Sequence, residues 1–218
     1  MRTITVKGVG AVSVRPDQTE LCMELENLDL DYEVAMTKAA SQIAELLGAF
    51  AGLGFEKSEL KTTDFDVNMK YENVKDRFGN YSNVFKGYRV SHSLKLAFDL
   101  DASLIGRVLA AVASCKAKPE LSIRFGIKNP GAVSAALLRS ATENAKEKAG
   151  ILCESAGVRL GALVSVDYSW GELAVYSRTR YAVQEECVCC SATPISGMEF
   201  EPDDIDARDS ATFVWEIL

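Results

Sequence analysis

A strict two-residue alternation near the N-terminus is the feature that most constrains what this chain can fold into. Between residues 3 and 15, apolar or glycine residues fill one set of alternate positions, and polar or small residues mostly fill the other. The first set consists of Ile4, Val6, Gly8, Gly10, Val12 and Val14. Because successive side chains of a β-strand point to opposite faces, the pattern predicts a long, half-buried strand. Gly8 and Gly10 fall on its apolar face, where glycine permits a bulge or the close approach of another element.

Similar patterns predict the remaining elements. Alternation indicates strands near 21–25, 63–71, 88–98, 121–127, 163–170 and 211–217, and the turn signal Pro16-Asp17 makes the first two strands a hairpin. Helical spacing of apolar residues indicates helices over roughly 31–52, around 104–112 after a cap at Asp99 or Asp101, and from Pro130 to about 156. The expected order is β-β-α-β-β-α-β-α-β-loop-β.

This order predicts an α+β fold with mixed, mainly antiparallel sheets and helices on one face. A chain of 218 residues fits one large or two small domains. We expect a discontinuous α+β subdomain from 1–84 plus 206–218, in which the C-terminal strand pairs with the N-terminal hairpin. We also expect a β-α-β-α-β subdomain over 85–170 that resembles a ferredoxin-like plait. Residues 171–205 are predicted to be a loop insertion with cysteines and an acidic run.

The charge and the apolar runs exclude some classes of partner. Lys and Arg total 24 against 31 Asp and Glu, a formal charge of −7, which argues against nucleic-acid binding. No apolar stretch approaches the length of a transmembrane helix, so no membrane span is expected. The N-terminus shows no signal peptide, which predicts a cytoplasmic protein, or a periplasmic or exported one if a signal was removed.

The chain has six cysteines and one histidine, and these residues limit the metal, redox and nucleophilic chemistry that it could perform. Cys22, Cys115 and Cys153 stand singly in apolar or helical contexts, as small buried residues do. The cluster Cys187, Cys189 and Cys190 is different, because three thiols within four residues suit a soft metal such as zinc, or redox chemistry. Glu185 and Glu186 precede it, but no second C-x-x-C or nearby histidine supplies the fourth ligand of a closed zinc site. A cysteine-rich loop with fortuitous spacing is the other interpretation.

No catalytic constellation emerges from the other polar residues. His92 falls on the apolar face of its strand, as a hydrogen-bonded core residue would. A catalytic pair of His92 with one of the six cysteines is the alternative, but no local signature supports it. Asp64 and Asp66 fall on the polar face of another strand, which favours solvation over a metal or acid–base pair. Gly8-Val9-Gly10 lies inside a strand, so it is not a phosphate loop. We therefore predict a protein that is not an enzyme and has no cofactor.

Two aromatic segments are candidate contact surfaces. The polar loop 73–83 and its flanks carry the first group of aromatic residues, and the 171–205 insertion with its flank carries the second. The first group is Tyr71, Phe78, Tyr81 and Phe85, and the second is Trp170, Tyr176 and Tyr181. Either segment could contact a second copy or another protein, or be a mobile loop.

Five phrases, in order, resemble the SIMPL-domain family. The opening I-T-V-K-G-V-G-A-V-S-V-R-P-D covers residues 4–17, and L-K-T-T-D-F-D-V covers 60–67. G-Y-R-V-S-H-S-L covers 87–94, F-G-I-K-N-P covers 125–130, and A-K-E-K-A covers 145–149. The resemblance spans nearly the whole chain apart from about 171–205. The chain departs from the family in lacking an export signal and in carrying His92 where the family usually has asparagine.

The resemblance implies a widespread family of mostly unknown biochemistry, without established catalytic residues. Many members are exported to the periplasm, some are associated with oxidative-stress defence, and some assemble as rings or channels. A vertebrate member is linked to a signalling kinase. We therefore expect a non-enzymatic SIMPL-domain protein that forms a homo-oligomer or binds another protein, with a link to stress response. The alternative is a metal- or redox-responsive protein that uses Cys187, Cys189 and Cys190.

Overall fold

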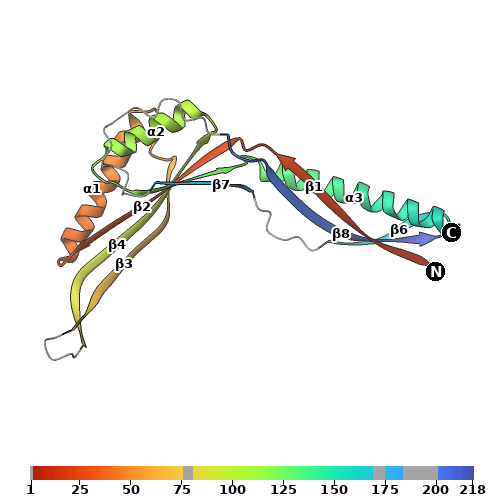
Figure 1. Cartoon of the computed structure of the whole chain (residues 1–218), viewed down its shortest axis with the longest axis horizontal. Coiled ribbons are helices and arrows are strands. Elements are labelled where there is room, and N and C mark those ends of the chain that lie inside the picture. Colours follow the sequence, from red (N-terminus) through yellow and green to blue (C-terminus); the bar gives the residue numbers. More distant parts are fainter. Residues whose placement is uncertain (1, 76–80, 169–174, 184–200) are drawn as a thin grey trace. The chain divides into compact units, whose positions relative to one another are not determined.

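A computed structural model describes residues 2–75, 81–168, 175–183 and 201–218 (Figure 1). The chain divides into two compact units. The first takes Met1–Asp17, Gly126–Arg178 and Pro202–Leu218, and the second takes Gln18–Phe125 and Thr179–Glu201. The described residues contain three helices and eight strands in two sheets, so the predicted α+β class is confirmed.

The first unit holds a three-stranded sheet in the order β1-β8-β6. Its strands are β1 (Thr3–Val14), β6 (Leu160–Asp167) and β8 (Ile205–Ile217), and β8 pairs antiparallel with both neighbours. The predicted pairing of the C-terminal strand with the N-terminal strand is therefore present. Helix α3 (Pro130–Ser155) packs on this sheet; it begins where the Asn129 side chain accepts a hydrogen bond from the N–H of Ala132.

The packing of α3 on β1 depends on glycine. A Cβ atom on Gly8 would lie within 3.0 Å of the Ala141 carbonyl oxygen, and one on Gly10 within 3.0 Å of the Leu137 carbonyl oxygen. Real Cβ atoms essentially never approach so closely, so the backbone of α3 occupies the space that side chains would need. The close approach predicted from the two glycines is confirmed, and the buried stripe of α3 is correspondingly rich in alanine.

The second unit holds most of a five-stranded sheet in the order β3-β4-β2-β5-β7. Its strands are β2 (Gln18–Asp29), β3 (Leu60–Lys75), β4 (Tyr81–Asp99), β5 (Glu120–Gly126) and β7 (Tyr176–Val183). Helices α1 (Tyr32–Ala51) and α2 (Ala102–Ser114) contribute to the core of this unit. The alternating apolar residues of β2 and β4 meet the apolar stripes of both helices, which removes these side chains from water. The core includes Leu21, Met23, Leu25, Leu46, Phe50, Leu94, Leu96, Phe98, Ile105 and Val108.

Several predicted connections differ from the structure. The predicted hairpin of the first two strands is wrong, because β1 pairs with β8 whereas β2 pairs with β4. Residues 85–170 do not form one plait: β4 and β5 belong to the five-stranded sheet and β6 to the other. The units accordingly divide near 17 and 125 rather than at 84 and 170. Alternation identifies which face of a strand is buried but not which strand lies beside it.

The predicted loop 171–205 also needs correction, since β7 occupies Tyr176–Val183 within it. Its strand signal is weak because arginine, serine and threonine fill half of the segment. Among the described residues, no helix is both long and apolar enough to cross a membrane.

Strands β3 and β4 form a long antiparallel hairpin, and residues 73–75 and 81–83 of the predicted polar loop belong to these strands. The last pair between β2 and β4 is Asp29 with Tyr88, whereas β3 and β4 stay paired as far as Lys75 and Tyr81. The hairpin therefore extends past the end of β2, as Figure 1 shows. We call the extension, residues 70–75 and 81–87, the arm.

Candidate functional site

The arm is joined to the rest of the second unit by a ladder of aromatic rings. Tyr32, at the start of α1, meets Tyr88 edge-on, with ring centroids 5.5 Å apart. Tyr88 meets Phe85 at 5.4 Å with an angle of 75° between the ring planes, and Phe85 meets Tyr71 at 5.6 Å with an angle of 63°. Edge-to-face contacts at these distances are favourable beyond the burial of the rings. The ladder therefore holds the arm in a defined orientation to α1.

Large apolar side chains of the arm and its base are nevertheless open to solvent. The exposed fraction is 59% for Met69, 54% for Tyr71 and 67% for Tyr81. Around them lie charges: Lys86 donates to Glu72 at 2.6 Å and holds the pKa of that carboxyl below its usual value. An exposed group of aromatic and methionine side chains with a charged rim is typical of a protein-contact surface.

The outer edge of β3 adjoins this surface. Among the described residues, β3 is the last strand of its sheet, and its ladder with β4 runs without a register shift from Asp64 to Lys70. Its two faces differ: one carries an apolar row and the other a polar row. The apolar row is Phe65, Val67 and Met69, and the polar row is Asp64, Asp66, Asn68 and Lys70. Asp64 and Asp66 are exposed, as the prediction of a solvated face required.

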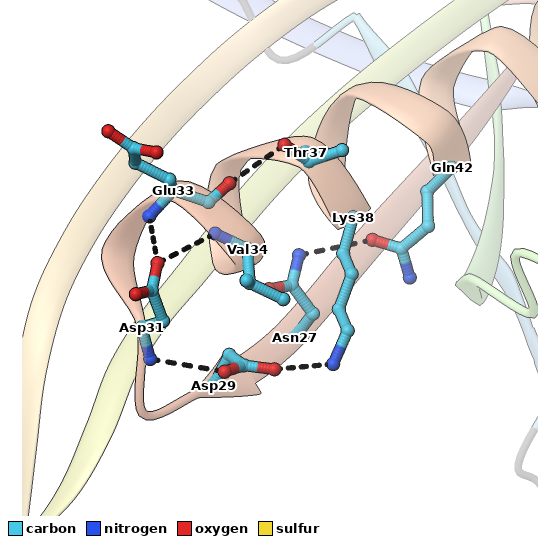
Figure 2. Close-up of polar contacts among 8 residues, drawn as sticks. All are labelled: Asn27, Asp29, Asp31, Glu33, Val34, Thr37, Lys38 and Gln42. Carbon is cyan, nitrogen blue, oxygen red and sulfur yellow. Dashed lines mark hydrogen bonds and ion pairs between the residues drawn. The ribbon is translucent and has the colours of Figure 1, made fainter.

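The base of the arm is fixed by a polar network at the start of α1, which Figure 2 shows. Asp31 caps the helix, its carboxylate accepting from the N–H groups of Glu33 and Val34 at 2.8 and 3.1 Å. Lys38 donates to Asp29 at 2.6 Å, and this contact holds the pKa of the Asp29 carboxyl below its usual value. These contacts lock the turn between β2 and α1.

His92 is a core residue, as predicted, with an exposed fraction of 6%. Its Nε2 lies 2.8 Å from the Thr62 hydroxyl, and its ring packs edge-on against Phe65 at 5.1 Å. Nδ1 is buried and has no hydrogen-bond partner among the described residues. Burial lowers the pKa of the imidazole, because a charged ring would lose its hydration there. His92 therefore anchors β3 to β4 beside the apolar row.

The three single cysteines occupy packing positions without disulfides. Cys153 is buried in α3, as predicted, whereas Cys22 and Cys115 are half-buried. The Cys115 thiol lies 3.7 Å from the Glu45 carboxylate. Burial, followed by the neighbouring charge of Glu20, raises the pKa of the Cys22 thiol, which keeps it protonated and weakly reactive.

The cluster Cys187, Cys189 and Cys190 lies outside the described residues, as do Glu185, Glu186, Phe78 and Trp170. Within the described part of the chain, no group of three or more His, Cys, Asp and Glu side chains is arranged to hold a metal ion. The second predicted aromatic segment is partly described: Tyr176 is exposed, and Tyr181 packs against the core of the second unit.

Sequence reasoning identified the aromatic residues of the arm but missed the edge of β3. Alternation over 63–71 predicted the strand and its two faces correctly. It carried no information about which neighbour each strand takes, so it could not show that β3 ends the sheet.

Comparison with known proteins gives two findings. The profile of the SIMPL family, described as "Protein of unknown function (DUF541)", matches residues 4–215. The chain is also similar to the "26 kDa periplasmic immunogenic protein" of Brucella abortus, with 26% identity over 163 residues. The protein of the same name from Brucella melitensis biotype 1 matches at the same identity and length. Each alignment covers 75% of this chain and 65% of the relative, so the chain spans about two thirds of their length.

Proposed function

The chain belongs to the SIMPL family, and from this premise we propose that it is a non-enzymatic protein that acts through contacts with copies of itself or with another protein. The observation that carries the proposal is the exposed apolar surface of the arm and its base. Its main members are Met69, Tyr71 and Tyr81, each more than half exposed.

Three properties of this surface support protein binding. Tyrosine and methionine are enriched at protein interfaces, where their large side chains contribute much contact area. The ladder through Phe85 and Tyr88 restrains Tyr71 before any partner arrives, which reduces the entropy lost on binding. The charged rim of Glu72 and Lys86 supplies orientation.

For location, we propose the periplasm. The support is the name of the Brucella relatives, which places those proteins there. The cytoplasmic location expected from the sequence has no such support. A link to stress response stays a prediction from the family resemblance.

Light scattering across a wide concentration range, under reducing conditions, tests the proposal. We expect a mass above that of the monomer, or a specific protein recovered by the tagged chain from an extract. The double variant Tyr71→Ser with Tyr81→Ser is expected to reduce either result. Leu152→Ser, a similarly exposed apolar residue on α3, is the matched control and is expected to have no effect. A strict monomer at high concentration that recovers no partner would contradict the proposal.

The alternative of metal or redox sensing stays a prediction, because Cys187, Cys189 and Cys190 lie outside the described residues. Elemental analysis and thiol titration of the wild type against the triple Cys→Ser variant decide it. Bound zinc, or a reversible change in thiol count that the variant lacks, would favour this alternative over simple protein binding.

A further inference from the structure

We propose that β3 pairs along its outer edge with β3 of a second copy of this chain. The two strands run antiparallel, with a two-fold axis at Val67. This inference rests on the proposed function and names the partner and the mode of contact.

The edges of β1, β6 and β3 are not equally available for pairing. At β1, side chains of α3 accept hydrogen bonds from backbone N–H groups that a new strand would need. Asn144 accepts from the N–H of Val9 at 3.1 Å, and Ser140 accepts from the N–H of Ala11 at 3.4 Å. The edge strand β6 shifts register twice along its eight residues, which leaves no long regular stretch. Exposed edges invite pairing with another strand unless they are covered or irregular. In β3, the seven residues from Asp64 to Lys70 pair with β4 without a register shift, so their outer edge is a regular stretch for another strand.

The charges of this stretch are complementary to themselves. Antiparallel pairing about Val67 sets Asp64 opposite Lys70 of the second copy, and the symmetry repeats this pair. Opposite charges directly across a sheet stabilise the pairing, whereas like charges oppose it. Asp66 then faces Asn68 of the other copy, an amide that can donate to it.

Slips of two residues set like charges opposite each other. A slip of two residues in one direction sets Asp66 opposite Asp66 of the second copy. A slip in the other direction brings Asp66 opposite Lys70 but also sets Asp64 opposite Glu72, twice by symmetry. A slip of one residue sets polar positions opposite apolar ones, because side chains alternate between faces. Among these registers, the one centred on Val67 sets opposite charges across the two strands without setting like charges opposite each other, so the charge pattern favours it.

The apolar row gains most from the same pairing. It brings Phe65 opposite Met69 of the second copy, and Val67 opposite itself. Phe65 and Met69 are both exposed in the single chain, and Val67 is half-buried. Pairing joins two short apolar rows into one strip across the two-fold axis, which removes these side chains from water. This burial supplies affinity, and the charged row on the other face supplies register.

A charge-swap mixing experiment tests the inference. The variants Asp64→Lys and Lys70→Asp each place like charges opposite each other twice in the proposed register. We expect each variant alone to dimerise about tenfold more weakly than the wild type. An equimolar mixture of the two restores opposite charges at both positions, and we expect its dimerisation constant to return to near the wild-type value. The swap of Glu143→Lys with Lys146→Glu on α3 is the control and should change nothing.

Hydrogen exchange provides an independent readout, and circular dichroism checks that each variant is folded. Concentration-dependent protection of backbone amides between 64 and 70 in the wild type supports the pairing; protection confined to other segments refutes it.

The outcomes separate this inference from the proposed function. If the wild type assembles but neither variant weakens it, or the mixture fails to recover, β3 pairing is refuted while protein binding through the arm stands. If the wild type stays monomeric and recovers no partner, the proposed function fails as well. Protection of 64–70 that requires another protein would show that the edge binds that protein and not a second copy.

Discussion

Substituting Gly10 with alanine should strongly destabilise the first unit. The new Cβ atom would lie within 3.0 Å of the Leu137 carbonyl oxygen and at 3.0 Å from the Ala141 nitrogen. Both are backbone atoms of α3, so no side-chain rotation relieves the overlap. The helix must move away from β1, or β1 must bend, and either change loosens the packing of Ala145 against Val6 and Trp215.

The cost follows from this geometry. Overpacking a core costs about 1–3 kcal/mol, and we expect about 3 kcal/mol because a whole helix backbone has to shift. In a chain of this length that corresponds to a fall in melting temperature of about 6–12 °C. Urea unfolding followed by the fluorescence of Trp215, which is buried in this unit, measures the change.

Gly150→Ala is the matched control, because it lies in α3 and a Cβ atom there would meet nothing within 4 Å. Alanine is a better helix former than glycine, so we expect a gain of about 1 kcal/mol. If Gly10→Ala unfolds at the same urea concentration as the wild type, the argument that glycine admits the helix backbone is refuted.

Three further predictions concern the second unit. Because burial lowers the folded-state pKa of His92, the unfolded chain takes up the proton more readily, so the free energy of unfolding should fall as pH drops below about 6.5. The urea midpoints at pH 7.5 and pH 5.0 should therefore differ less in His92→Asn than in the wild type. An equal difference in the two proteins would contradict this role of His92. Asp31→Ala should cost about 0.5–2 kcal/mol through loss of the helix cap, as thermal melts can show, whereas an unchanged melt would exclude a capping role. Gly87 has a φ of 138°, and a Cβ atom there would overlap the Asp29 carbonyl oxygen. Gly87→Ala should therefore lower the melting temperature and speed hydrogen exchange of the backbone amides in the arm. An unaltered exchange rate would contradict this prediction.

Local patterns predicted much of the fold. Alternation placed β1, β3, β4 and β8 correctly, and helical spacing placed α1 and α3, because these signals depend on residues near one another along the chain. They also predicted that Gly8 and Gly10 would admit a close neighbour. β7 was missed, since its alternation is masked by polar residues.

The candidate site divides in the same way. The sequence by itself determined the aromatic composition of the arm, the two faces of β3, and the burial of His92 on an apolar face. The tertiary structure alone decided that β1 pairs with β8 rather than β2, and that β3 ends its sheet. Strand partners come from contacts between distant residues, which compete through packing of the whole core. A local pattern therefore predicts which face of a strand is buried. That β3 lies at the edge of its sheet is decided only by the pairing of all the strands.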